Sequence, residues 1–148
     1  MTLTFTTHDE SIPDASRIDD GLDAFNVRAA ALDGVVPIVC IARTPSGEVA
    51  GGAVARTWGT CAELQQLWVA EAHRRQGVGS RLVRLYEARA RSRGCTTFYL
   101  TTFSFQAPSL YRALGYRSAL ELDGFPDGIV KYVMLRRDDP IDSRAVPG

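Results

Sequence analysis

The chain has 148 residues, 45% of them hydrophobic, and its 17 basic and 17 acidic side chains balance to a formal net charge of zero. A compact chain of this length buries about 70% of its unfolded surface, which excludes a disordered protein and a small scaffold held by disulfides. No apolar run approaches the roughly 20 residues of a membrane helix, and the N-terminus does not read as an export signal, so we expect a cytoplasmic protein that contacts no membrane.

In chain order, Leu3 and Phe5 alternate with threonines and predict a short strand, and the alanine-rich stretch over residues 15–32 predicts one or two helices. Three strands are expected next, over residues 35–42, 49–58 and 61–69. Short turns at residues 44–47 and 59–60 join these strands, so the three form an antiparallel meander.

Residues 77–93 predict the most regular helix, which ends at Gly94. Its apolar stripe consists of Val78, Leu82, Leu85, Tyr86 and Ala90. The remaining elements are a strand over residues 96–103, a short helix over 108–114, and a hairpin of strands 116–122 and 129–135 across a loop at 123–128.

This order predicts one α/β domain over residues 1–137, with a mixed, mostly antiparallel central sheet of six to seven strands flanked by helices. The polar segment over residues 138–148 is expected to be a disordered tail. Three cysteines, Cys40, Cys61 and Cys95, stand singly in apolar or β-branched stretches without a C-x-x-C pair, so we expect buried, reduced thiols and no metal site.

Charge is distributed unevenly along the chain. The first 33 residues carry seven acidic side chains and two basic ones, whereas residues 74–93 carry seven arginines and one acidic residue, Glu87. A local basic field within a neutral chain indicates a discrete anionic ligand rather than an extended nucleic-acid surface. A solvated basic helix face explains many of the same arginines.

The most informative segment, residues 67–82, reads as a strand, a loop with arginines and glycines, and a helix start. Free amides at a helix N-terminus attract anions, and Gly77 and Gly79 let the backbone approach a pyrophosphate closely. A tight structural turn is the alternative. No Gly-Lys-Ser/Thr follows, which excludes a Walker loop, and Leu82 stands where a dinucleotide fingerprint has its third glycine.

Residues 74–79, RRQGVG, follow the strand end Leu67-Trp68-Val69 and resemble the acyl-CoA-binding motif of the GNAT superfamily of N-acetyltransferases. A second motif of that superfamily, a tyrosine in a short helix followed by Leu-Gly-Phe/Tyr, is similar to residues 109–116, SLYRALGY. The resemblance covers most of the chain and implies a GNAT-like fold with splayed central strands and acetyl-CoA as the acyl donor. It assigns cofactor-binding positions to Leu67, Trp68, Val69, Arg74, Arg75, Gln76, Gly77, Val78, Gly79 and Ser80.

By the same resemblance, main-chain groups at Leu67 and Val69 hold the pantetheine arm, and the Val69 amide faces the developing oxyanion. Many relatives have an asparagine seven residues before the tyrosine. This chain has Ser104 there and Gln106 two residues later, so both are candidates for a contact to the pantetheine arm or for a loop or capping role.

The resemblance makes Tyr111 the candidate acid toward the departing thiolate, as a hydrogen-bond donor more than as the source of a full proton transfer. An aromatic helix residue packed in the core is the alternative for Tyr111. Glu63 matches the position of a glutamate base found in one branch of the superfamily, and strand alternation places it on the face of Leu67 until a bulge intervenes. A glutamate in solvent is the alternative for Glu63, and His73 is a second candidate base.

For the acceptor, the resemblance indicates the first helices and the last hairpin, where Phe25, Phe125 and Tyr132 either line the slot or belong to the core. The acidic N-terminal third favours a cationic amine or is a solvated face. We therefore expect an N-acetyltransferase that acts on a primary amine of a small molecule or peptide by direct attack in a ternary complex, with a homodimer possible by analogy to relatives. The alternatives are a non-catalytic acyl-CoA-binding module and another type of nucleotide-binding domain.

Overall fold

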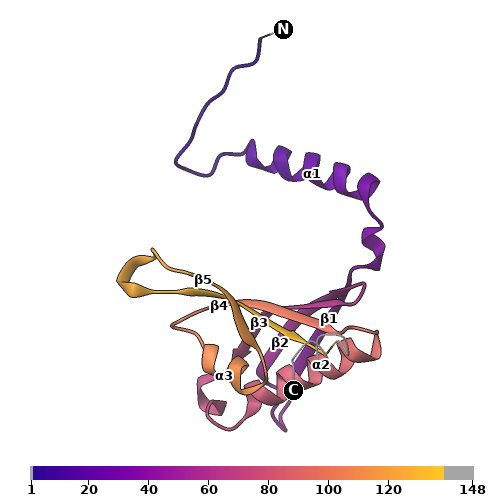
Figure 1. The fold of residues 1–148 in the computed structure, drawn as a ribbon, viewed down its shortest axis with the longest axis vertical. Coiled ribbons are helices and arrows are strands. Elements are labelled where there is room, and N and C mark those ends of the chain that lie inside the picture. The colour runs from indigo at the N-terminus through magenta and orange to yellow at the C-terminus, as the bar shows by residue number, and fades with distance from the viewer. Residues whose placement is uncertain (1, 139–148) are drawn as a thin grey trace, which may run out of the picture. The chain divides into compact units, whose positions relative to one another are not determined.

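The computed structural model describes residues 2–138 (Figure 1). They fall into two compact units, the first ending at Asp33 and the second beginning at Gly34. The first unit holds α1 (Ala15–Ala29), which ends three residues before the predicted boundary. The strand predicted around Leu3 and Phe5 does not form, because a strand needs a partner and this unit contains a single extended segment. The single-domain interpretation stays a prediction.

The second unit is built on a six-stranded sheet with the order β1-β2-β3-β4-β6-β5. Its strands are β1 (Val36–Arg43), β2 (Val49–Trp58), β3 (Cys61–Val69), β4 (Thr97–Phe103), β5 (Arg117–Leu122) and β6 (Lys131–Arg137). The meander and the last hairpin are confirmed as antiparallel pairs, and β3 with β4 is the one parallel pair among the described strands. The hairpin inserts β6 between β4 and β5, so a mixed, mostly antiparallel sheet is confirmed.

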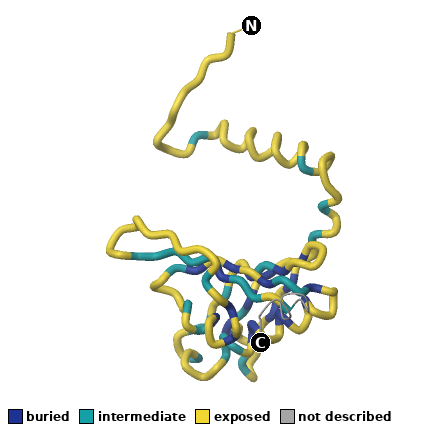
Figure 2. Tube along the Cα trace, viewed as in Figure 1, coloured by how far each residue is buried: buried dark blue, intermediate teal, exposed yellow. Residues whose placement is uncertain are grey.

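A long helix covers much of the face of the sheet that carries the core. This helix, α2 (Val78–Ser92), packs against β1, β2 and β3 (Figures 1 and 2). Leu85 was predicted in its apolar stripe but is 54% exposed, whereas Val83 and Glu87 are buried. The buried positions are 82, 83, 86, 87 and 90, which repeat at helical spacing. The buried stripe is therefore rotated around the helix axis by about one residue from the predicted stripe.

The core of the second unit lies between α2 and the sheet, where Tyr86, Phe98, Leu100 and Met134 are almost fully buried. The thiols of Cys40 and Cys95 are buried, as expected, and burial raises the pKa of both. Cys61 is exposed, contrary to expectation.

The tail predicted from residue 138 lies outside the described residues except for Asp138. That residue belongs to the folded unit, since its carboxylate forms ion pairs with Arg91 and Arg136. Among residues 2–138, no helix is long and apolar enough to cross a membrane.

Candidate active site

The central feature of the sheet is that β3 and β4 pair at one end and separate at the other. Their parallel pairing covers Cys61–Glu63 opposite Thr97–Tyr99 and goes no further. Beyond Glu63, β3 keeps its pairing with β2, and beyond Tyr99, β4 keeps its pairing with β6. The predicted splay of the central strands is therefore present.

A β-bulge marks the point where β3 leaves β4. Ala55 lies opposite Leu64 and Val54 lies opposite Gln66, so Gln65 is an extra residue on β3. Side chains on the two sides of the bulge consequently alternate with opposite phase. Leu64 and Leu67, three residues apart, both face the core, and Glu63 faces away from it. Period-two alternation, which would have placed Glu63 and Leu67 on one face, ends at this bulge.

The free edge of β3 presents main-chain groups to the opening. The Ala70 amide donates to the Ala50 carbonyl on β2 at 2.8 Å. Because successive residues of a strand turn their amides to opposite sides, the Val69 and Leu67 amides point to the side from which β4 has departed. The Val69 carbonyl on that side accepts a hydrogen bond from Arg74 Nε at 3.0 Å.

A cleft of about 800 Å³ occupies the space between the separated strands. Ten of the predicted donor-binding residues line it: Leu67, Trp68, Val69, Arg74, Arg75, Gly77, Val78, Gly79, Ser80 and Gln106. Gln76 and Ser104 are not part of its lining. The Gln76 side chain bonds instead within its own loop, to the Ala72 carbonyl.

At one end of the cleft, the start of α2 has the backbone geometry expected of the predicted anion cradle. Gly77 has a φ of 75°, in the left-handed region that glycine adopts readily, and Arg75 adopts a φ of 61° two residues earlier. The amides of the first helical turn have no partner inside the helix, and the first helical hydrogen bond runs from Arg81 to Gly77. These amides and the arginines beside them favour a diphosphate at this end.

Tyr111 lies on the opposite wall, on the short helix α3 (Pro108–Ala113). It is 7% exposed, and burial raises its pKa to about 12. Its side chain lines the cleft, and its hydroxyl makes no hydrogen bond to any described residue, so this donor is available to a ligand.

Gln106, and not Ser104, stands at the cleft. Its Oε1 accepts hydrogen bonds from Thr102 Oγ1 at 3.0 Å and from the Phe103 amide at 2.8 Å, which leaves its amide NH₂ as a donor. Ser104 Oγ accepts from the Val130 amide at 3.0 Å and joins β4 to the segment before β6.

Glu63 lies at the paired end of β3 and outside the lining of the cleft. Its Oε1 accepts a hydrogen bond from Arg56 Nε and pairs with Arg56 Nη2, both at 2.8 Å. The other candidate base, His73, lines the cleft at the diphosphate end.

The three predicted acceptor residues lie apart from one another in the chain. Phe125 packs edge to face on Phe103, at the end of β4, and Tyr132 pairs with the cleft residue Thr102 across the β4–β6 ladder. Tyr132 also packs against the core and under the Arg112 guanidinium. Phe25 belongs to α1 in the first unit, and its role stays a prediction.

Gly51 on β2 was not predicted from the sequence. A Cβ atom at this residue would lie 2.8 Å from the Trp68 carbonyl oxygen and 3.3 Å from Val69 Cα, so only glycine allows β2 to pass this close to the paired edge of β3 beside the cleft. Two adjacent glycines inside a strand were the available signal, because glycine in a strand interior often marks a close backbone approach.

No group of three or more His, Cys, Asp or Glu side chains that could hold a metal ion occurs in the described part of the chain. A sheet split beside a helix N-terminus, with a free tyrosine hydroxyl on the far wall, is suited to an extended thioester with a diphosphate at one end.

Comparison with known proteins identifies the family. The model of the acetyltransferase (GNAT) family matches residues 6–116. The chain is 38% identical to blasticidin-S acetyltransferase of Streptomyces morookaense over 91 residues, 61% of this chain and 67% of that one, and 30% identical to an acetyltransferase of Agrobacterium fabrum over 77% and 84% of the two chains. The crystal structure of an acetyltransferase from Bacillus cereus shares the fold, with a TM-score of 0.74 at 24% identity over 90% of this chain and 97% of that one.

The fold and the site thus define an acyl-CoA-dependent acyltransferase. The chain belongs to the GNAT acetyltransferase family. Its predicted activity, acetyl-CoA-dependent N-acetylation, and the use of acetyl-CoA as donor are confirmed.

Proposed function

We propose that this enzyme acetylates a primary amine of a small molecule by direct attack of the amine on the thioester in a ternary complex, with a peptide amine as the second possibility. The observation that carries the proposal is the cleft between β3 and β4, which has an anion cradle at one end and an unpartnered tyrosine hydroxyl on its wall. Both substrates fit such a cleft at once if the amine approaches from the side opposite the cradle.

Donor binding is assigned to two groups of atoms. The amides at the start of α2, with Arg74 and Arg75, bind the diphosphate. Main-chain groups of Leu67 and Val69 bind the pantetheine arm as a neighbouring strand would, and the Gln106 amide NH₂ supplies the side-chain contact that many relatives obtain from asparagine. The Val69 amide then stabilises the negative charge that develops on the carbonyl oxygen.

Tyr111 acts on the leaving group by donating a hydrogen bond to its sulfur. A thiol has a pKa of about 8.5, so complete proton transfer from a tyrosine whose pKa is about 12 would be uphill by about 5 kcal/mol. Burial therefore makes Tyr111 a weak acid that stays protonated, which suits hydrogen-bond donation to a departing thiolate.

Glu63 is our candidate for the base that removes the proton from the amine. It faces the side of the sheet away from the core, so it would act through a water molecule and exchange its bond to Arg56 for one to that water.

The acceptor proposal is supported by the relative named blasticidin-S acetyltransferase, so blasticidin S is the first compound to test. The test is release of CoA thiol from acetyl-CoA in the presence of single amines: blasticidin S, polyamines, aminoglycosides and lysine-containing peptides. We expect turnover with at least one cationic small molecule and none without an amine. Turnover with peptides alone would overturn the small-molecule assignment.

Location and assembly follow as separate proposals. The buried thiols of Cys40 and Cys95 support a reducing, cytoplasmic location, which fractionation of the producing cells would test. We also propose a homodimer by analogy to relatives, for which light scattering after size-exclusion chromatography gives the direct answer.

A further inference from the structure

The helix that carries Tyr111 cannot hold its own position. At six residues, α3 is far shorter than the roughly 12 to 15 residues at which an isolated helix becomes marginally stable. A hydrogen-bond donor in an active site must nevertheless be placed to within about half an ångström. The position of the Tyr111 hydroxyl therefore depends on contacts from outside α3.

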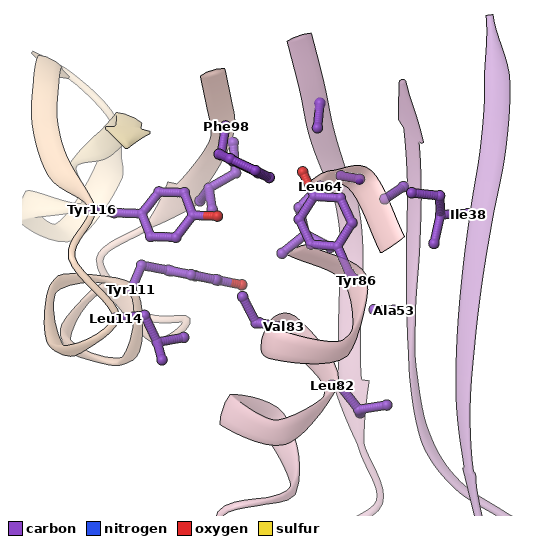
Figure 3. Close-up of a cluster of buried hydrophobic side chains, with 14 of the residues drawn as sticks. Ile38, Ala53, Leu64, Leu82, Val83, Tyr86, Phe98, Tyr111, Leu114 and Tyr116 are labelled. Carbon is purple, nitrogen blue, oxygen red and sulfur yellow. The ribbon is translucent and has the colours of Figure 1, made fainter. Parts of the chain in front are cut away.

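Tyr116 makes two such contacts. Its amide donates to the Tyr111 carbonyl at 2.9 Å, and its ring packs edge to face on the Tyr111 ring, with centroids 6.0 Å apart at 74°. Figure 3 shows the two rings beside each other, next to Val83 of α2. Any shift of Tyr116 is thus transmitted to both the backbone and the ring of Tyr111.

Tyr116 is held in turn by Glu87, a buried acid that the proposed mechanism does not use. The Tyr116 hydroxyl donates to Glu87 Oε2 at 2.8 Å, and the two residues are 3% and 1% exposed. A bond between a hydroxyl and a carboxylate is among the stronger and more directional hydrogen bonds in proteins.

The same carboxylate is also linked to the C-terminal end of α3, through Arg136. Glu87 Oε1 lies 3.6 Å from Arg136 Nη1, and that nitrogen donates to the Leu114 carbonyl, directly after the helix. Arg91, one helical turn along α2, lies 4.0 Å from the same oxygen. Glu87 is the one acidic residue in the segment 74–93, which also carries seven arginines. It links α2 to α3 in two ways, through Tyr116 and through Arg136.

We propose that Glu87, acting through Tyr116 and Arg136, is the positioning residue for Tyr111. The inference rests on the role proposed above for Tyr111. Because the N-terminus of α2 forms the diphosphate cradle, a single helix then sets the distance between the cradle and the donor that faces the thioester sulfur.

The test is a double-variant cycle on kcat with the acceptor identified by the amine panel. Tyr116→Phe keeps the ring contact and removes the bond to Glu87. We expect it to lower kcat about tenfold with a KM for acetyl-CoA within about twofold of the wild type. In a Tyr111→Phe background the same change is expected to have almost no further effect on kcat, because the group being positioned is gone.

Glu87→Gln is the second variant, for use if Tyr116→Phe folds poorly. It keeps an oxygen that can accept from Tyr116, and we expect a loss in kcat of about threefold that also disappears in the Tyr111→Phe background. Thr57→Val is the matched control. Thr57 lies on another part of the sheet, and its buried hydroxyl accepts a hydrogen bond from Arg93. Removing this hydroxyl should lower thermal stability without changing kcat.

Two outcomes would overturn the proposal in different ways. In the first outcome, Tyr111→Phe lowers kcat, but Tyr116→Phe either lowers kcat by the same factor in both backgrounds or leaves kcat unchanged. Glu87 then has only a structural role. If Tyr111→Phe itself leaves kcat unchanged, the assigned role of Tyr111 is wrong and the positioning role is wrong with it.

Discussion

The two ends of the β3–β4 pair differ in a way that explains why we place the chemistry at one of them. At the end near Cys61, three residue pairs form a regular parallel ladder, and side chains alternate between the two faces. At the end near Val69 the ladder is absent and main-chain groups of β3 line a cleft. The same two strands thus build a rigid support at one end and a binding edge at the other.

The difference shows how a sheet can bind a ligand without giving up its stability. Unpaired main-chain groups inside a protein are costly, yet the free edge of β3 is held in place because β2 pairs with β3 from Cys61 to Val69, except at the Gln65 bulge. Part of the missing pairing is supplied by Arg74 at the Val69 carbonyl. The remaining groups are available to the donor substrate, which we propose binds along this edge as an added strand would.

The largest effect is expected at the open end. Tyr111→Phe should lower kcat by about 10²-fold or more, with little change in acetyl-CoA affinity, because the hydroxyl is needed at the departing sulfur and not for binding. Steady-state kinetics and calorimetry measure the two quantities. An unchanged kcat would remove Tyr111 from the mechanism.

The buried tyrosines make stability sensitive to alkaline pH. A tyrosine ionises near pH 10 in the unfolded chain but near 12 at Tyr111 in the folded one, so the stabilisation is complete below pH 10 and is lost as the pH rises toward 12. Tyr111 alone should account for about 2 kcal/mol of the free energy of unfolding lost by pH 12. Urea unfolding at pH 9 and pH 12 should show a smaller loss for Tyr111→Phe, and equal losses would contradict the assignment.

The paired end is tested at Glu63. Glu63→Gln should lower kcat/KM about 30-fold at neutral pH, if its carboxylate removes the amine proton through water, and should leave acetyl-CoA binding intact. Arg56→Gln is the control, since it removes the ion-pair partner and keeps the carboxylate. If both changes lower kcat/KM by the same small factor, Glu63 is only a surface residue of the ladder.

Matched glycines at the two ends test the comparison most directly. Gly51→Ala would push against the Trp68 carbonyl at the open end, and we expect acetyl-CoA to bind about tenfold more weakly. At the paired end, Gly59 has a φ of 59° with nothing within 4 Å of an added Cβ. Gly59→Ala should cost about 1 kcal/mol of stability and leave the affinity unchanged. Calorimetric titration distinguishes the two results.

Much of the second unit is predictable from the chain because the signals are local. Strands β2 and β3 have the predicted bounds, since turn residues mark their ends, and Gly94 ends α2 as expected. The cradle at Gly77 is equally local, as it needs one strand end and one helix start. The exposure of Cys61 and the position of the stripe on α2 were not predicted, because both depend on which neighbour covers each side chain.

From residue 34 onward, the sequence by itself determined the order of the elements, the backbone of the predicted anion cradle and the two motifs that identify the family. Only the tertiary structure decided that Gln65 is a bulge that turns Glu63 away from Leu67, that Gln106 and not Ser104 reaches the cleft, and that Glu87 is buried beneath Tyr116. The physical reason is range. Turn and helix preferences act over a few residues, whereas register, splay and buried ion pairs depend on segments that meet only when the sheet is assembled.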